Sequence, residues 1–327
     1  MPKIAVVTGC SGGIGRATAI AFGNRGWRVA LLARSPEGLQ GAQKDVERVG
    51  GEAMVIPTDI ADQAAVEAAA AQVEREWGPI DVWVNDAMAT IFCEFMRIDP
   101  ADFKRATDVT YLGAVWGTLA ALKRMKARDH GTIVQVGSAL AYRSIPLQAA
   151  YCGAKSALRG FTDSIRCELI HDRSRVHLTM VHLSAFNTPQ FDWGRTCMPN
   201  KPKPLGKIFQ PEIAAEGVYW SATHRRRELW VGWPATQAIL GTRVLPGFLD
   251  RMLAFNAYEG QQADERIGND RADNLWAPVR EDRGAHGRFD NGALTWSAQF
   301  WFTTHRWLGV LVAVMALSAL GVALAMF

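Results

Sequence analysis

The sequence carries little excess charge and no long basic run. Its 327 residues have a formal net charge of +4, and no stretch of lysines and arginines alternates with aromatic side chains. Such a stretch is typical of nucleic-acid-binding proteins, so we expect no nucleic-acid partner. With 49% hydrophobic and 21% charged residues, the composition is that of an ordinary globular protein, long enough for one large domain with appended segments.

Cysteine is also scarce. The chain has five cysteines, an odd number, with no Cys-x-x-Cys pair and no cluster of cysteine and histidine at the spacing of metal ligands. We therefore expect no metal site, and we expect the cysteines to be reduced thiols in a cytosolic protein. The first apolar run begins at residue 3, which leaves no room for a signal peptide before it.

Short apolar runs alternate with helical patterns over roughly the first 230 residues. Strands that alternate with helices of about 10–15 residues predict a single α/β domain, a doubly wound parallel sheet of the Rossmann type. Ligands bind such sheets beyond the C-terminal ends of the strands, so residues that follow the strands are candidates for a site. The expected strands are residues 3–8, 27–33, 52–57, 80–85, 132–137, 176–183 and 228–231.

A glycine-rich turn joins the first strand to the first helix. Its sequence is TGCSGGIG (residues 8–15), and a helical pattern follows directly. Glycines let the backbone turn tightly and approach the pyrophosphate of a dinucleotide, and the free N–H groups at a helix N-terminus attract phosphate. The alternative is a flexible turn that binds nothing. The candidate phosphate ligands are Thr8, Gly9, Ser11, Gly12, Gly13, Ile14 and Gly15.

The residue after the second strand distinguishes two dinucleotide cofactors. An acidic residue at this point binds the adenosine ribose of NAD, whereas this chain has Arg34. A guanidinium suits the 2′-phosphate of NADP, so we expect NADP(H) in preference to NAD(H). The alternative is an ordinary surface arginine. Other candidate cofactor contacts follow later strands, namely Asp59, Ile60, Asn85 and Thr188.

The fifth strand and the helix after it supply a further group of polar residues. Tyr151 and Lys155 lie four residues apart, so on a helix they share one face, and Ser138 follows the fifth strand. A nearby ammonium favours the ionised form of a phenol, whose ordinary pKa is about 10. Ser138 would hydrogen bond the same reacting oxygen, so the three could exchange a proton with a carbonyl or an alcohol. On its own, the Tyr–Lys pattern has a surface pair as its alternative.

Taken in order, these motifs resemble those of the short-chain dehydrogenase/reductase family over roughly residues 1–230. The resemblance implies that Tyr151 is the general acid/base and that Ser138 orients the substrate oxygen. Lys155 would lower the pKa of Tyr151 and hold the nicotinamide ribose while hydride passes between the nicotinamide and the substrate carbon. The other implied cofactor contacts are Asn85 and Ala87 at the adenine side and Thr188 near the carboxamide.

Three positions depart from the family pattern. Met88 replaces a glycine near the cofactor, and Leu183-Ser184 replaces Pro-Gly after the sixth strand. Thr110 stands where the family has an asparagine of the proton relay, and we keep it as a candidate at that position. The family also implies a homo-oligomer formed through helices at residues 100–128 and 149–171.

The expected activity is that of an NADP(H)-dependent oxidoreductase acting on a carbonyl and its secondary alcohol. An alternative is an NADP(H)-binding scaffold or sensor that has lost turnover, and an epimerase or dehydratase on the same fold is a third. Residues 188–210, rich in proline and glycine, could close over the site as a lid. Aromatic residues near this segment predict an apolar substrate pocket, with a core or dimer interface as the alternative: Phe92, Phe95, Phe186, Phe191 and Trp193.

The C-terminal part of the chain changes character twice. We expect the catalytic domain to span residues 1–258, and residues 259–295, with few apolar and many charged side chains, to be a flexible polar linker. Residues 296–327 would be a membrane anchor, since residues 307–327 carry no charge and would span about 31 Å as a helix. Arginines before this segment would keep the catalytic domain in the cytoplasm. The alternative to the anchor is a C-terminal helix buried in the globular domain. If the protein is anchored to a membrane, a lipophilic substrate would suit it.

Overall fold

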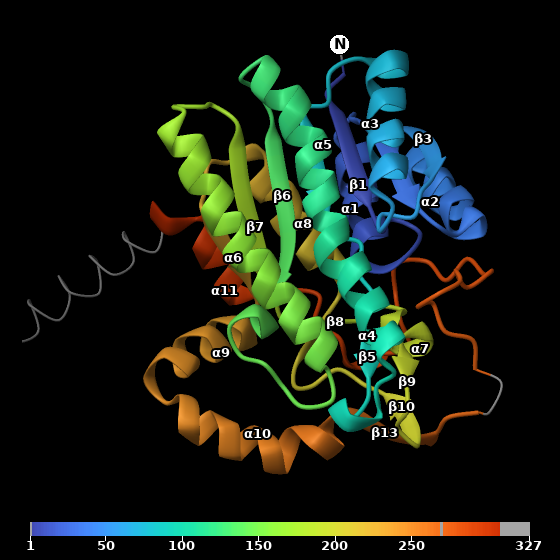
Figure 1. Ribbon diagram of the computed structural model, residues 1–327, viewed down its shortest axis with the longest axis vertical. Coiled ribbons are helices and arrows are strands. Elements are labelled where there is room, and N and C mark those ends of the chain that lie inside the picture. The colour runs from blue at the N-terminus through green and yellow to red at the C-terminus, as the bar shows by residue number, and fades with distance from the viewer. Residues whose placement is uncertain (1, 269–270, 308–327) are drawn as a thin grey trace, which may run out of the picture.

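A seven-stranded parallel sheet forms the centre of the protein (Figure 1). The computed structural model describes residues 2–268 and 271–307. Each pair of neighbouring strands in this sheet is parallel. The strands fall where the sequence predicts them, and the doubly wound α/β fold is confirmed. In spatial order they are β12 (Glu228–Val231), β7 (His177–Leu183), β6 (Thr132–Ser138), β4 (Val82–Asn85), β1 (Ile4–Thr8), β2 (Arg28–Ala33) and β3 (Glu52–Pro57).

Helices cover both faces of the sheet (Figure 1). Side chains of Ser35, Asp62 and Asp99 accept hydrogen bonds from backbone N–H groups and so cap α2, α3 and α4. One face carries α1 (Gly13–Gly23), α2 (Pro36–Arg48) and α8 (Pro211–Thr223). The other carries α3 (Gln63–Trp77), α4 (Pro100–Thr107), α5 (Gly113–Ala127) and α6 (Ala149–His171).

The hydrophobic core lies in two layers, one on each face of the sheet. All five residues of β1 are buried, as expected for a parallel strand with helices on both sides. Trp83 and Ile133 pack into the layer beneath α3 and α5, whereas Leu31 and Val84 pack into the layer beneath α1 and α8. A fully buried aliphatic side chain contributes about 1.5–3 kcal/mol. This packing fixes the strands, and with them the loops at their C-terminal ends.

The helix predicted at residues 100–128 is interrupted. A π-helical turn, Asp108–Leu112, joins α4 to α5 and contains Thr110. Such turns are rare in proteins, and those that do occur are often found at functional sites. The hydroxyl of Thr110 donates to the carbonyl oxygen of Ala89 (2.8 Å) and accepts from the N–H of the same residue (2.9 Å). These two bonds tie the turn to the loop that follows β4.

The segment predicted as a lid is folded against the domain. It contains the single helical turn α7 (Gln190–Trp193), and its short strands pair with distant parts of the chain. The parallel pairs are β5 (Ile91–Phe92) with β9 (Arg195–Thr196) and β8 (Ala185–Phe186) with β11 (Ile208–Phe209). The antiparallel pair is β10 (Asn200–Pro202) with β13 (Gln262–Arg266).

Two further helices follow the sheet, α9 (Trp233–Val244) and α10 (Pro246–Gly260). The break between them falls at Pro246, the first residue of α10. The two helices lie below the C-terminal ends of the strands in Figure 1. They expose large apolar side chains, with Trp233 56%, Phe248 63% and Phe255 82% exposed.

The predicted linker, residues 259–295, differs from the expectation over its described parts. Residues 273–287, which we call the strap, lie against the catalytic domain, and Leu275 within the strap is completely buried. Beyond the strap, α11 (Ala298–Thr304) packs against β12. The sequence favours a linker because the segment is polar, but its backbone and charged groups find partners on the domain.

The predicted transmembrane helix, residues 307–327, falls almost wholly outside the described part of the chain, which ends at residue 307. Across residues 2–268 and 271–307, no helix combines the length and the apolar character needed to cross a bilayer.

The prediction that every cysteine is a free thiol is wrong. Cys93 and Cys197 form a disulfide, with their Cα atoms 5.1 Å apart. The two residues are separated by 104 positions in the sequence and meet because β5 pairs with β9. Sequence spacing cannot reveal such a pair, because the pairing of the two strands creates the contact. The other cysteines, Cys10, Cys152 and Cys167, are free.

We therefore expect three titratable thiols in the unfolded protein. The measurement is a thiol titration in denaturant of protein purified without reductant, repeated after reduction, when five thiols are expected. The double variant Cys93→Ser/Cys197→Ser should lose about 4 kcal/mol of unfolding free energy, because a long loop is no longer closed in the unfolded chain. Five thiols before reduction would contradict the disulfide.

Candidate active site

A cavity opens at the C-terminal edge of the sheet, beside the point between β1 and β4 where the direction of winding reverses. Ligands of doubly wound sheets bind at this place. Most of the residues selected from the sequence line the cavity, although they come from separate parts of the chain. They are Gly9, Ser11, Gly12, Gly13, Ile14, Arg34, Asp59, Ile60, Ala87, Ser138, Tyr151, Lys155 and Thr188.

The glycine-rich turn brings β1 and α1 close to the loop after β4. Gly9 has a φ of +76°, and a Cβ at this residue would lie 2.6 Å from the Cα of Ala87. Only glycine fits there. The first residues of α1, Gly13 and Ile14, line the cavity, and no side chain caps the N-terminus of the helix. A phosphate is the ligand that this cradle suits, because the N–H groups and the helix dipole both attract negative charge.

The remaining candidates, Thr8, Gly15, Asn85 and Thr110, do not line the cavity. Thr8 accepts hydrogen bonds from the N–H groups of Asp86 (3.0 Å) and Ala87 (3.1 Å), which fixes the loop after β4. Of the two residues expected at the adenine side, Ala87 lines the cavity, whereas Asn85 is buried outside the cavity wall. The side chain of Asn85 bonds to Trp83, Thr118 and Gln135.

Ser138, Tyr151 and Lys155 converge at the inner end of the cavity. β6 delivers Ser138, and α6 carries the other two on one face. The Nζ atom of Lys155 lies 5.6 Å from the centre of the Tyr151 ring and donates to the carbonyl oxygen of Val136 (2.6 Å). The hydroxyl oxygen of Ser138 accepts a hydrogen bond from the N–H of Leu140 (3.1 Å), and Ser138 lowers the pKa of Tyr151. The arrangement places one hydroxyl donor and one phenol side by side, above a buried ammonium.

The pKa of Tyr151 differs from the sequence-based expectation. Burial raises the pKa of Tyr151 above its ordinary value, and the neighbouring polar side chain of Ser138 opposes that rise. Charges on Cys152 and Asp86 would raise it further. In the protein without a bound cofactor, desolvation of the phenol therefore outweighs the stabilising effect that we expect from Lys155.

Asp86 is a site residue that the sequence analysis did not select. It lines the cavity, and burial raises its pKa to about 7, while the charge of Lys155 opposes the rise. Burial lowers the pKa of Lys155 to about 8, and the carboxylate of Asp86 opposes that fall. Each group thus makes the other's charge less costly. A signal was present in the sequence, since an acidic residue directly follows a strand end in Asn85-Asp86.

Arg34 and Asp59 lie at the outer end of the cavity. Asp59 pairs with Arg105, with an N–O distance of 2.6 Å. The guanidinium of Arg34 donates to backbone carbonyls of the strap. Burial lowers the pKa of Arg34, with Asp59 opposing and Arg105 adding to the shift. The strap also contributes Asn274, Pro278, Val279 and Glu281 to the cavity wall, and nothing in the polar sequence of residues 259–295 indicated this.

Two of the five aromatic residues expected around a substrate line the cavity, namely Phe186 and Trp193. Phe92 and Phe191 are buried and pack against each other, with ring centres 5.9 Å apart. Phe95 is 65% exposed. Phe186 and Trp193 add apolar surface to the cavity wall, and Trp193 lies against the glycine-rich turn, since a Cβ at Gly12 would be 2.8 Å from its ring. The other three belong to the core or the surface.

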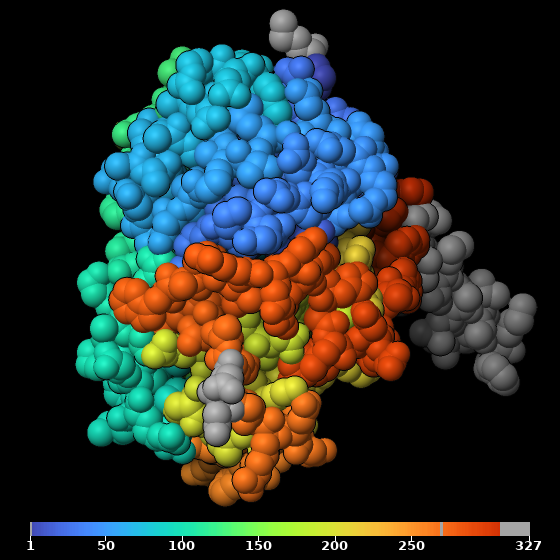
Figure 2. Space-filling model, turned by 90° about the vertical axis from the view of Figure 1, so that its right-hand side faces the viewer, coloured from blue at the N-terminus to red at the C-terminus, as the bar shows by residue number. Residues whose placement is uncertain are grey.

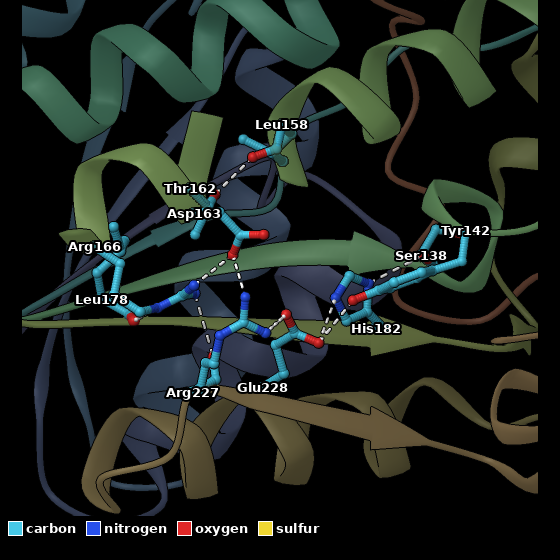
Figure 3. Close-up of polar contacts among 10 residues, drawn as sticks. All are labelled: Ser138, Tyr142, Leu158, Thr162, Asp163, Arg166, Leu178, His182, Arg227 and Glu228. Atoms are coloured by element: carbon cyan, nitrogen blue, oxygen red, sulfur yellow. Dashed lines mark hydrogen bonds and ion pairs between the residues drawn. The ribbon is translucent and has the colours of Figure 1, made fainter. Parts of the chain in front are cut away.

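A buried polar network lies behind Ser138 (Figure 3). Nδ1 of His182 is 3.1 Å from the carbonyl oxygen of Ser138, and its Nε2 is 3.6 Å from a carboxylate oxygen of Glu228. The hydroxyl of Tyr142 donates to the same oxygen (2.8 Å), and Arg227 pairs with Glu228 from outside. Burial lowers the pKa of His182, which keeps the ring neutral. The network links β6, β7 and β12 and supports the backbone that carries Ser138.

Comparison with known proteins agrees with this site. Residues 3–193 match the short chain dehydrogenase family. The uncharacterized oxidoreductase YxnA of Bacillus subtilis is 31% identical over 271 residues, 82% of this chain and 76% of the relative. The 3-dehydrosphinganine reductase of Danio rerio is 32% identical over 64% of this chain and 65% of its own length.

A solved structure of a metagenomic short-chain oxidoreductase in complex with NADP is similar in fold. It has a TM-score of 0.60 and 27% identity, and the match covers 70% of this chain and 96% of that chain. The family match includes the glycine-rich turn, Ser138, Tyr151 and Lys155. This chain therefore belongs to the short-chain dehydrogenase family of oxidoreductases.

Proposed function

We propose that the protein is an NADP(H)-dependent oxidoreductase that interconverts a carbonyl compound and a secondary alcohol, with Tyr151 as the general acid/base. The observation that carries this proposal is the convergence of Ser138, Tyr151 and Lys155 at the inner end of the cavity that begins at the glycine-rich turn. A cofactor bound along that turn would end beside the phenol. The NADP complex of the similar metagenomic oxidoreductase supports the choice of cofactor.

The chain's own residues would handle the proton and the orientation of the substrate. When bound, the nicotinamide supplies or accepts the hydride. In the direction of reduction, the phenol of Tyr151 gives its proton to the carbonyl oxygen, and the hydroxyl of Ser138 donates a second hydrogen bond to that oxygen. Both groups act on the same atom, so they fix which carbon faces the cofactor. In oxidation, Tyr151 takes the proton back from the alcohol.

Lys155 would supply the positive charge beneath the phenol. Its ammonium is held by the carbonyl oxygen of Val136 at 2.6 Å, and the carboxylate of Asp86 favours its charged form. As the phenol gives up its proton, a phenolate forms, and a buried ammonium stabilises that charge more strongly than a solvated one would. Arg34 would hold the 2′-phosphate of NADP(H) at the other end of the cavity.

A lipophilic substrate is part of the proposal. Phe186 and Trp193 add apolar surface to the wall of the cavity that Tyr151 also lines. The similar Danio rerio protein is a 3-dehydrosphinganine reductase. A small-molecule carbonyl with an aliphatic or ring-shaped body would bury apolar surface against these side chains.

Replacing Tyr151 by Phe should reduce turnover of NADPH with carbonyl substrates by at least about 100-fold, because general acid–base catalysis contributes about 10²–10⁴-fold. The measurement is NADPH oxidation with a panel of soluble and lipid-like carbonyls, alongside NADPH binding by fluorescence titration. Binding should survive, since the hydroxyl is at the far end from the phosphates.

The control is Tyr258→Phe, which removes a phenol outside the cavity lining and should leave turnover unchanged. Full activity in the Tyr151 variant would overturn the proposed role. Tight NADPH binding without turnover across the panel, and in reverse with alcohols, would favour a cofactor-binding scaffold or sensor. The engagement of Thr110 with Ala89, where the family has its relay asparagine, is the observation that favours this alternative.

The rate of reduction should fall as pH rises through about 8, because Lys155, whose pKa burial lowers to about 8, then loses its charge. Asp86→Asn removes the carboxylate that holds this pKa up, so the alkaline limb should move to lower pH. The check is a pH–rate profile of both proteins, with the exposed Asp264→Asn as the control. An unshifted limb in the Asp86 variant would contradict the electrostatic link.

We also propose that residues 307–327 hold the protein at a membrane with the catalytic domain in the cytoplasm, and that it forms homo-oligomers. The exposed Trp233, Phe248 and Phe255 of α9 and α10 suit an apolar surface nearby. In cell fractionation the full chain should sediment with membranes, whereas a variant ending at residue 306 should be largely released. Release of both to the supernatant would rule out the anchor.

A further inference from the structure

The strap crosses the cavity from the adenosine end to the glycine-rich turn. Figure 2 shows this C-terminal part of the chain, in orange, lying directly against the N-terminal part, in blue. The carbonyl oxygen of Val279 accepts from the hydroxyl of Ser35 (3.1 Å), and that of Gly284 accepts from the N–H of Gly13 (3.1 Å). The strap therefore contacts both the end of β2 and the start of α1.

Arg34 binds the strap through three hydrogen bonds. One terminal nitrogen of the guanidinium donates to the carbonyl oxygens of Leu275 (3.2 Å) and Trp276 (3.1 Å), and the other donates to that of Asn274. Both terminal nitrogens thus point at three consecutive peptide carbonyls. These nitrogens are the same donors that a planar guanidinium uses to bind a phosphate.

Side chains on the strap hold these carbonyls in place. Leu275 is completely buried, and its carbonyl also accepts from Arg105 (3.2 Å). The indole N–H of Trp276 donates to Asp102 (2.7 Å), and Arg105 lies 5.8 Å from the centre of a Trp276 ring. Neither Leu275 nor Trp276 lines the cavity. Of the three residues whose carbonyls bind Arg34, Leu275 and Trp276 therefore lie outside the cavity wall, whereas Asn274 is part of it.

The cavity continues beneath the strap. Its wall includes Ser11 and Gly12 of the glycine-rich turn and Asp59 of the loop after β3, facing Val279 and Glu281 of the strap. The pyrophosphate that NADP(H) and NAD(H) share would take the N–H of Gly13 from the carbonyl of Gly284, so this exchange is common to both cofactors. A 2′-phosphate needs the donors of Arg34, which the carbonyls already hold. The part shared by both cofactors and the 2′-phosphate of NADP(H) therefore require different contacts of the strap to change.

We propose that the strap is a specificity-determining element, in which the carbonyls of residues 274–276 compete with the 2′-phosphate of NADP(H) for Arg34. This inference rests on the proposed function. NADP(H) must displace the carbonyls from Arg34 when it binds, whereas NAD(H), with a hydroxyl in place of the phosphate, leaves them where they are. The strap thus reduces the preference for NADP(H) that Arg34 alone would give.

The energetic reason is the difference between the two partners of the guanidinium. A phosphate carries full charge and forms stronger hydrogen bonds with an arginine than a neutral peptide carbonyl does. Replacing the strap carbonyls by the 2′-phosphate at Arg34 is therefore favourable. The free energy gained is smaller than for an unoccupied arginine, because the carbonyls lose their hydrogen bonds to Arg34. When the released state is only partly populated, the apparent affinity falls by that fraction. This loss of apparent affinity applies to NADP(H) and not to NAD(H).

Trp276→Ala tests the competition, because it removes the bond to Asp102 without altering the cavity wall. Dissociation constants of NADPH and NADH are measured for the full chain and its variants by fluorescence titration. NADPH should bind about fivefold more tightly in the variant, the equivalent of one lost hydrogen bond, while NADH changes by less than about twofold. The matched control is Trp296→Ala, since Trp296 is 62% exposed and Trp276 54% exposed.

Arg34→Ala separates the failure of this inference from the failure of the proposed cofactor preference. In the Arg34→Ala background, adding Trp276→Ala should no longer tighten NADPH binding, because there is no guanidinium to release. If Arg34→Ala leaves the ratio of the two constants unchanged, Arg34 does not bind the 2′-phosphate and the proposed preference fails. Absence of any cofactor binding in all variants would overturn both proposals.

Hydrogen–deuterium exchange supplies a readout that does not depend on turnover. NADPH should increase exchange in residues 274–281, and NADH should not. Equal tightening of both cofactors by Trp276→Ala would mean that the strap blocks the whole cavity, which overturns its role in specificity. Weaker NADPH binding, or slower exchange with NADPH, would mean that the strap supports the phosphate, and an unchanged affinity would mean that it does not compete.

Discussion

The ammonium of Lys155 is buried at the end of the sheet, and the arrangement of the site follows from the cost of keeping it charged. An isolated charge in the interior would lose its proton. Here the carbonyl of Val136 and the carboxylate of Asp86 favour the charged form, and both come from the ends of neighbouring strands, β6 and β4. The parallel register of these strands brings the two partners to one place. Tyr151 gains a positive charge beneath it only because this pairing is maintained.

The same electrostatic link explains how the site accommodates departures from the family pattern. Asp86 takes part in the charge balance, and Met88, two residues later, lines the cavity where the family has a glycine. Thr110 does not line the cavity, and its hydroxyl forms hydrogen bonds with both the N–H and the carbonyl oxygen of Ala89. That contact steadies the loop carrying Asp86. Thr110, at the position of the relay asparagine, thus fixes the backbone of the loop after β4. The buried pair of Asp86 and Lys155 remains in place.

Local pattern was enough to predict the strands and the glycine-rich turn, because each depends on residues adjacent in sequence. The convergence of Ser138, Tyr151 and Lys155 was also predictable, since strand ends of a parallel sheet share one edge. Contacts made by distant segments were not. The Cys93–Cys197 disulfide depends on two short strands pairing, and the network of His182 and Glu228 spans neighbouring strands from separate parts of the chain. The strap was missed because backbone carbonyls make its main contacts, and these carry no sequence signal.

The polar composition of residues 259–295 predicts a linker on the assumption that order requires apolar burial. The strap shows a different balance, with Leu275 as its fully buried apolar side chain and charged groups that meet partners on the domain. Asp282 pairs with Arg16, and His286 lies between Glu212 and Asp290. The pairs of His286 are exposed, and an exposed ion pair contributes about 0–1 kcal/mol, whereas the guanidinium of Arg16 is buried. The segment is thus held by many separate polar contacts. A segment held in this way can exchange one partner for another without unfolding the domain, which an apolar interface of the same length could not do. The polarity that suggested a disordered linker is therefore the property that would let the strap release Arg34 to a phosphate in the proposed exchange.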